Sequence, residues 1–165
     1  MIFLLDANVL INAKNFYYPI DRVPEFWDWL VHQGETGNIK VPVEIYQELI
    51  SGTDELVEWA KDSEVRTALE LDEEVQVDVV RRVVNQAYAP DLNDVEQIEV
   101  GRDPFLISYA YTDPENRSIV TEEVSKPSKI RGRRRIPDAC DTLNVNAINT
   151  FNLIRTLDFS TGWNR

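Results

Sequence analysis

Four carboxylates of this 165-residue chain stand where they could do chemistry together. Each lies beside a segment whose pattern predicts a strand or a helix. Clustered carboxylates repel one another and raise one another's pKa values, and a divalent cation makes such a cluster tolerable by neutralising it. Oxygen-only ligands select hard ions such as Mg²⁺ or Mn²⁺, which can activate water and stabilise charge on a phosphoryl group. The four candidates are Asp6, Glu48, Asp103 and Glu123.

The composition argues against other kinds of catalytic site. A single histidine, His32, excludes His-rich zinc sites and argues against a Ser-His-Asp hydrolase. Cys140 is the only cysteine, so no internal disulfide can form, which fits a reducing cytosol. We expect His32 at the surface or at a helix end, and Cys140 as a small buried hydrophobe. Catalysis by this chain would therefore rest on carboxylates.

The charge distribution is uneven. The net charge is -12, yet one short segment carries six basic residues and no acidic one, which leaves -18 for the rest of the chain. An acidic surface repels phosphate chains unless arginines, lysines or metal ions intervene. We call residues 126–135 the basic loop. Its cations are Lys126, Lys129, Arg131, Arg133, Arg134 and Arg135.

Short apolar runs alternate with helical patterns along what we expect to be a single domain, residues 1–165. The expected strands are residues 2–5, 38–42, 117–123 and 145–149. The expected helices are residues 7–13, 23–37, 43–52, 53–64, 74–89, 103–112, 137–144 and 150–159. This alternation predicts an α/β fold with a mainly parallel central sheet flanked by helices. Ligands of such sheets bind outside the carboxyl ends of the strands, where Asp6 and Glu123 fall.

Membrane insertion is not expected. No stretch reaches the roughly 18 apolar residues of a membrane span. The apolar run at the N-terminus is too short, and lacks the basic flank, to be a signal peptide. We therefore expect a cytoplasmic protein. The aromatic residues Phe16, Tyr17, Tyr18, Phe26, Trp27 and Trp29 are expected to pack in the core or against a partner.

A structural role competes with the chemical one at each carboxylate. Asp6 lies at a strand-to-helix junction, where an Asp commonly caps the helix. Asp103 stands before Pro104, which predicts an N-cap followed by proline at the first helical position. Glu48 lies on the polar side of its helix and could simply be solvated. Because the chain has 29 acidic residues, spacing alone does not decide between these roles.

Four segments, taken in order, resemble the motifs of the PIN-domain nuclease family. Each places an acidic residue after a strand or on a helix, and together they extend over nearly the whole chain. The family includes the VapC-like toxin ribonucleases, and "IPDACDTLN" is closer to a less characterised PIN-like branch. The four segments are "FLLDANVLINA", "VPVEIYQELISG", "GRDPFLISYA" and "SIVTEE".

The resemblance implies roles for individual residues. Asp6, Glu48, Asp103 and Glu123 match the family's acidic metal-site positions. The common fourth motif has Asp where Glu123 stands, so the residue that completes the site is left open. The residues in question are Glu122, Glu123, Asp138 and Asp141, of which Asp141 is included in the expected metal site. The expected supporting residues are Asn8, which would orient Asp6, and Thr121.

The resemblance further implies an Mg²⁺- or Mn²⁺-dependent endoribonuclease, plausibly the toxin of a toxin–antitoxin pair. It also implies a homodimer and a small antitoxin partner. We predict that Arg131, Arg133, Arg134 and Arg135 contact RNA, with a solvated loop as the alternative. A catalytically inactive PIN-like module that binds RNA or protein stays open, because Glu123 and the long segment 53–100 depart from the family. A metal-dependent phosphatase is a third possibility, although the chain lacks the Asp-x-Asp motif of one large phosphatase class.

Overall fold

Four parallel strands form one sheet in the computed structural model, which describes all residues from 1 to 165. The sheet order is β2-β1-β3-β4. All three pairings are parallel, which confirms the predicted α/β class and is consistent with a PIN-like fold. The strands are β1 (Ile2–Leu5), β2 (Ile39–Lys40), β3 (Arg117–Val120) and β4 (Ala147–Ile148).

Helices fill the connections between the strands. None of them is both long enough and apolar enough to cross a membrane. Two π-helical turns, η1 (Ala13–Tyr17) and η2 (Val84–Tyr88), continue α1 and α6, and a 3₁₀ turn, η3 (Arg131–Arg133), precedes α9. The helices are α1 (Ala7–Asn12), α2 (Pro24–Glu35), α3 (Val43–Leu49), α4 (Glu55–Lys61), α5 (Ser63–Leu69), α6 (Val77–Val83), α7 (Asp94–Val100), α8 (Asp103–Tyr111), α9 (Ile136–Leu143) and α10 (Thr150–Thr156).

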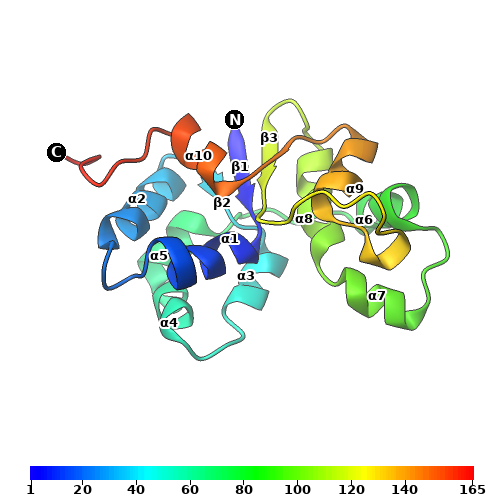
Figure 1. Ribbon diagram of the computed structural model, residues 1–165, viewed down its shortest axis with the longest axis horizontal. Coiled ribbons are helices and arrows are strands. Elements are labelled where there is room, and N and C mark those ends of the chain that lie inside the picture. The colour runs from blue at the N-terminus through cyan, green and yellow to red at the C-terminus, as the bar shows by residue number, and fades with distance from the viewer.

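The helices form two groups beside the strands. Figure 1 shows α2, α4 and α5 on one side and α6, α7, α8 and α9 on the other. One continuous apolar core joins both groups through the sheet, from Phe3 to Leu153. Phe26, Trp27 and Trp29 are buried in this core, as expected. His32 is exposed and stacks on Trp163, with ring centroids 5.0 Å apart, which confirms its surface position.

Two helices differ from the sequence expectation. The expected helix 53–64 is two short helices, because the Asp62 carboxylate accepts hydrogen bonds from the amides of Glu64 and Val65 and so starts α5. Helix α7 was not expected, although its start carries a capping box between Asn93 and Glu96. Both differences fall within residues 53–100, which we call the middle segment, where the sequence departs most from PIN domains.

The segment from α6 to α7 packs against α8, α9 and the basic loop. Helix α6 packs on α8, and η2 packs on α9. The basic loop lies against α7 at Gly132, which is buried. A Cβ atom at Gly132 would lie 2.9 Å from the Glu96 carbonyl oxygen, so only glycine permits this approach. The middle segment therefore holds the basic loop in place.

Candidate functional site

The strand register brings Asp6 and Thr121 side by side at the carboxyl end of the sheet. Leu5 of β1 pairs with Val120 of β3, so the next residues of the two strands are neighbours. The Asp6 amide donates to the Val120 carbonyl at 2.9 Å, and Thr121 Oγ1 donates to Asp6 Oδ2 at 3.0 Å. The carboxylate of Asp6 makes no capping hydrogen bond to α1. Helix capping therefore does not account for Asp6.

The Thr121 hydroxyl connects the residues around Asp6. It accepts hydrogen bonds from Asn8 Nδ2 at 3.3 Å and from the Glu123 amide at 3.1 Å, and it donates to Asp6. A hydroxyl has one donor and two acceptor lone pairs, so its capacity is filled. Asn8 Oδ1 in turn accepts from the Glu122 amide at 3.0 Å. Asn8 thus acts on Asp6 through Thr121.

The charges of Asp6, Glu48, Asp103 and Glu123 act on one another, and we call these four residues the acidic rim. Burial raises the pKa of Asp6 to about 6, and the charges of Glu123 and Glu48 add to the rise against the hydrogen bond from Thr121. Burial also raises the pKa of Asp103 to about 8, with Asp6, Glu123 and Glu48 adding to it. Four residues far apart in sequence therefore share one electrostatic environment.

Asp103 does not cap its helix. Arg102 occupies the N-cap of α8, Asp103 is the first helical residue and Pro104 is the second. The helix therefore begins one residue earlier than expected. No capping hydrogen bond is made by a side chain there. Since the side chain of Asp103 is mostly buried without a capping role, its position imposes a cost that the helix start does not explain.

The two adjacent glutamates after β3 point to different helices. Glu122 Oε1 accepts hydrogen bonds from the amide and the hydroxyl of Thr150, at the start of α10. Glu123 Oε2 accepts from the Ile136 amide at 2.8 Å, at the start of α9. Anionic side chains suit these positions because the first amides of a helix lack partners within it. The second carboxylate oxygen of Glu123 makes no hydrogen bond and can act in the acidic rim, whereas Glu122 stabilises the start of α10.

Asp138 and Asp141 lie apart from the acidic rim in their contacts. Asp138 is buried and accepts hydrogen bonds from Ser125 Oγ at 2.5 Å and from the Lys126 amide at 2.8 Å. Burial opposes its ionisation, but these two donors and the nearby arginines hold its pKa below the ordinary value. Asp141 is exposed near the end of α9. The structure therefore gives Asp138 a structural role and does not couple Asp141 to Asp6 or Asp103.

Half of the arginines expected to bind RNA are engaged within the protein. Arg131 Nε lies 2.7 Å from Glu96 Oε1, and Arg131 Nη1 lies 3.0 Å from Asp91 Oδ1. Arg134 donates to the Ala87 carbonyl and to the Thr142 hydroxyl, both at 2.7 Å. These contacts tie the basic loop to the middle segment.

The remaining cations of the basic loop are freer. The exposed Arg133 makes one long ion pair, 3.4 Å from Nε to Glu99 Oε1. The side chains of Lys126, Lys129 and Arg135 make no ion pair or hydrogen bond. These residues are the ones available to a phosphate.

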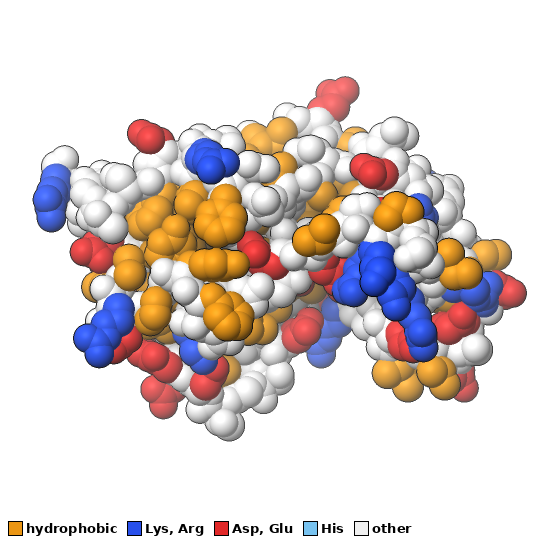
Figure 2. All heavy atoms as spheres, in the orientation of Figure 1, with side chains coloured by type: hydrophobic (Ala, Val, Ile, Leu, Met, Phe, Trp, Pro, Cys, Tyr) orange, Lys and Arg blue, Asp and Glu red, His pale blue; other side chains and the backbone are white.

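A cavity of about 300 Å³ joins the acidic rim to the basic loop. Figure 2 shows Lys and Arg side chains gathered over the segment that leads into α9, with acidic side chains beside them. No hydrophobic side chain lines the cavity. Its walls therefore suit a charged or hydroxyl-rich group rather than an aromatic one. The lining residues are Glu99, Asp103, Glu123, Lys129, Gly132, Arg133, Arg134 and Arg135.

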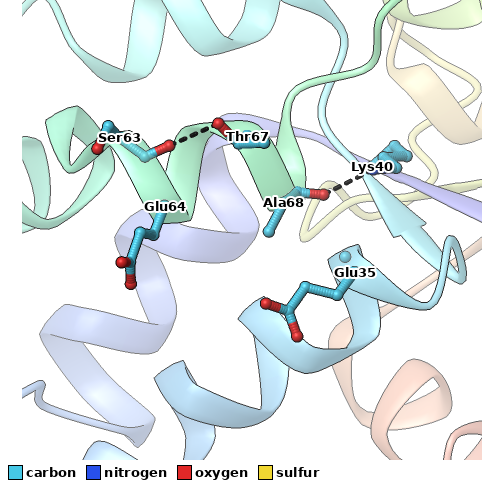
Figure 3. A pocket seen from close by; sticks show the side chains of 7 residues that line it. Glu35, Lys40, Ser63, Glu64, Thr67 and Ala68 are labelled. Atoms are coloured by element: carbon cyan, nitrogen blue, oxygen red, sulfur yellow. Dashed lines mark hydrogen bonds between the residues drawn. The ribbon is translucent and has the colours of Figure 1, made fainter.

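A larger cavity of about 650 Å³ lies elsewhere, between α2, β2 and α5 (Figure 3). Its one cation, Lys40, donates to the Ala68 carbonyl at 2.6 Å, and burial lowers the pKa of this amine. Glu35 and Glu64 extend toward the gap, but both are exposed (Figure 3). This cavity lacks the buried charges that distinguish the acidic rim.

The donor set of the acidic rim fits Mg²⁺ in one particular way. As the side chains stand, no group of three or more His, Cys, Asp or Glu residues is arranged to hold a metal ion. Mg²⁺ usually keeps several waters and binds through one or two carboxylates and the substrate's phosphates. Asp6 and Asp103 combine carboxylate oxygens with burial that disfavours their charge, which a cation would relieve. These two residues could hold the ion, with Glu48 and Glu123 at its edge.

Two residues near the acidic rim were not anticipated. Glu99 lines the cavity together with Lys129 of the basic loop, and the hydroxyl of Tyr88 is buried without a partner. No local pattern marks Glu99 or Tyr88, because they reach this region only through the docking of the middle segment. Cys140 is buried and its thiol pKa is raised to about 12 by burial, in agreement with its expected role as a hydrophobe.

The chain belongs to the family described as a domain of unknown function, DUF4411, which matches residues 3–161. No curated protein and no solved structure matches the chain. The family description assigns no activity, so a functional proposal depends on the chemistry of the acidic rim and its cavity.

Proposed function

We propose that this protein is an Mg²⁺- or Mn²⁺-dependent endoribonuclease of the PIN-like type. One observation carries the proposal. Four carboxylates are coupled at the carboxyl end of a parallel sheet, and two of them have pKa values raised to about 6 and about 8. Such a cluster destabilises the folded state unless a ligand compensates, so its presence points to a function.

The residues of the chain divide the work as follows. A divalent cation, when bound, neutralises the acidic rim and activates water toward a phosphoryl group. Asp6 and Asp103 supply the anionic oxygens, and the Thr121 hydroxyl keeps Asp6 oriented through its hydrogen bond of 3.0 Å. Arg135 and Lys129, which line the same cavity, bind the phosphate of the substrate.

The cavity supports a polynucleotide backbone as the substrate. A volume of about 300 Å³ without hydrophobic lining suits phosphate and sugar, whereas bases need stacking surfaces. Cleavage at this site would therefore show little base preference from the cavity itself. A metal-dependent phosphatase would use the same groups, but its small substrate would not need the adjoining cations of the exposed basic loop.

The proposal is tested by incubating the purified protein with mixed RNA. We expect cleavage with Mg²⁺ or Mn²⁺ and none with EDTA. A homogeneous 5′- or 3′-end chemistry of the products would identify the bond that is hydrolysed. Intact RNA at millimolar concentrations of both ions would argue against the activity.

A binding module without turnover is the second candidate, and one contact favours it. The Glu123 carboxylate is partly committed to the Ile136 amide, and a shorter Asp at that position is the common form in the PIN family. RNA binding without metal-dependent cleavage would select this alternative.

An exposed apolar patch supports the proposal of a protein partner. It lies over α1, η1 and α10, where Figure 2 shows hydrophobic side chains gathered. Phe16 is 72% exposed, and the rings of Tyr17 and Phe151 meet at 5.2 Å. Ile11, on α1, is also exposed. A homodimer or a small antitoxin would cover such a surface, and size-exclusion chromatography with light scattering distinguishes the dimer.

A further inference from the structure

Tyr88 is a buried polar residue whose hydroxyl has no partner. Its side chain is 8% exposed, and the hydroxyl oxygen makes no hydrogen bond within the protein. It is the last residue of η2, a π-helical turn that extends α6. Such turns occur often at functional sites. A buried hydroxyl without a partner is uncommon in folded proteins, so its position calls for an explanation.

The surroundings of the hydroxyl connect it to the acidic rim. Burial raises the pKa of the Tyr88 hydroxyl above its ordinary value, and the charges of Asp103, Cys140 and Glu123 add to the rise. Helix α6 packs on α8, which begins with Asp103, and η2 packs on α9, which begins next to Glu123. Tyr88 therefore lies among the helices that begin at Asp103 and beside Glu123.

The backbone around Tyr88 is held in place. The Ala87 carbonyl accepts a hydrogen bond from Arg134 Nη1 at 2.7 Å, and Ala89 and Ala87 are buried on either side. The tyrosine ring is thus presented from a segment fastened to the basic loop. This arrangement keeps the hydroxyl near the rim even though it bonds to nothing there.

We propose that Tyr88 is a positioning residue whose hydroxyl donates a hydrogen bond to the carboxylate of Asp103 when the acidic rim holds a divalent cation. The inference rests on the proposed function. A carboxylate has two oxygens, so one can face a cation while the other accepts from a phenol. Donors behind a metal-binding carboxylate orient it, and losing one typically weakens metal binding by about 10- to 100-fold.

The test is Tyr88→Phe, which removes only the hydroxyl. We expect isothermal titration calorimetry to show Mn²⁺ binding weakened by about tenfold or more. Without metal, the variant should melt at the same temperature as the wild type or slightly higher, because the hydroxyl has no partner to lose. A purely structural role for Tyr88 would leave Mn²⁺ affinity unchanged.

Tyr46→Phe is the matched control. Tyr46 is also buried, but its hydroxyl donates to the carbonyl of Ala60, which is not part of the rim, at 2.7 Å. This variant should melt at a lower temperature and bind Mn²⁺ as the wild type does. The two tyrosines should therefore give opposite patterns in stability and metal affinity.

The outcomes separate this inference from the proposed function. If wild type and Tyr88→Phe bind Mn²⁺ equally well, the role of Tyr88 is refuted and the nuclease proposal stands. If the wild type itself binds neither Mn²⁺ nor Mg²⁺, the proposed metal site and the role of Tyr88 fail together.

Discussion

The acidic rim and the basic loop are two charged regions of the molecule, and they differ in how far their charges are compensated. In the rim, carboxylates lie close to one another, and burial and mutual repulsion raise the pKa values of Asp6 and Asp103. In the basic loop it matches cations with partners, most completely at Arg131, which bonds to Glu96 and Asp91. Both regions were candidates for function on the sequence alone.

The comparison teaches that charges left uncompensated by the fold mark a site better than charge density does. A matched ion pair at the surface contributes little and needs no further explanation. Buried carboxylates that repel one another cost stability, and they persist where a ligand compensates. The four predictions below test whether the rim and the loop really differ in this way.

The largest expected effect is the loss of activity in Asp6→Asn. The amide keeps the acceptor for Thr121 but removes the charge that a cation needs, so RNA cleavage should fall to background while the fold is retained. Circular dichroism and a gel-based cleavage assay check both parts. Asp141→Asn is the matched control and should cleave normally, because Asp141 is exposed and not coupled to the rim. Wild-type cleavage by Asp6→Asn at saturating metal would show that the rim is not the active site.

Divalent ions should stabilise the protein. A ligand at about 100 times its dissociation constant adds about 2.7 kcal/mol to the free energy of unfolding. For a domain of this size that corresponds to a rise in melting temperature of about 5–10 °C. Differential scanning fluorimetry with Mn²⁺, reversed by EDTA, measures it, and Asp6→Asn should show a much smaller rise. A melting temperature unchanged by millimolar Mn²⁺ would show that no cation compensates the charges of the rim.

Without metal, stability should fall as the pH rises. The pKa values of Asp6 and Asp103, about 6 and about 8, lie above the ordinary value of 3.8, so the folded state binds their protons more tightly than the unfolded state does. Their stabilising contribution is complete below about pH 4 and is lost as the pH rises through about 6 and then about 8, by at most about 1.4 kcal/mol per unit for each group.

Thermal melts in EDTA at about pH 5.5 and about pH 8.5 test this dependence. The wild type should melt at the higher temperature under the more acidic condition. Asp103→Asn should show a smaller difference between the two conditions, because it has no proton to lose. An equal pH dependence in the two proteins would contradict the raised pKa of Asp103.

The smallest effects should divide the basic loop. Arg135→Ala should weaken RNA binding and lower the slope of log affinity against log salt by about 0.7, the value for one phosphate contact to a single strand. Arg131→Ala should leave that slope unchanged and lower the melting temperature, since its partners are Glu96 and Asp91. Fluorescence anisotropy with labelled RNA at several salt concentrations measures the slopes. The reverse pattern would mean that the internal ion pairs of Arg131 open to bind RNA.

Much of the fold and of the acidic rim followed from local patterns. The apolar runs predicted all four strands, and the alternation typical of a parallel sheet placed Asp6 and Glu123 at one edge. The start of α7 was also readable, because Asn93 and Glu96 form a capping box, yet this signal was not used. Local patterns could not predict against which part of the molecule each helix packs.

The partners of the arginines depended on that missing information. Arg131 and Arg134 are fully engaged because the middle segment docks on the basic loop, through contacts more than 30 residues apart in sequence. The same docking packs η2 against α9 and leaves the hydroxyl of Tyr88 buried without a partner. A pattern of charges along the chain cannot tell a paired arginine from a free one, because the pairing is decided by tertiary packing.

The register between β1 and β3 also determines which genetic changes the site can survive. Asp6 lies beside Thr121 because each directly follows a residue of the last pair in the register, Leu5 of β1 and Val120 of β3. Each strand residue advances the chain by about 3.3 Å and reverses the side of the sheet on which its side chain lies. A single-codon deletion inside either strand would therefore do more than remove one side chain, since it would turn Asp6 or Thr121 to the wrong face. Insertions and deletions among relatives should instead occur in the exposed turn at residues 112–116, where a change in length leaves the register between β1 and β3 unchanged.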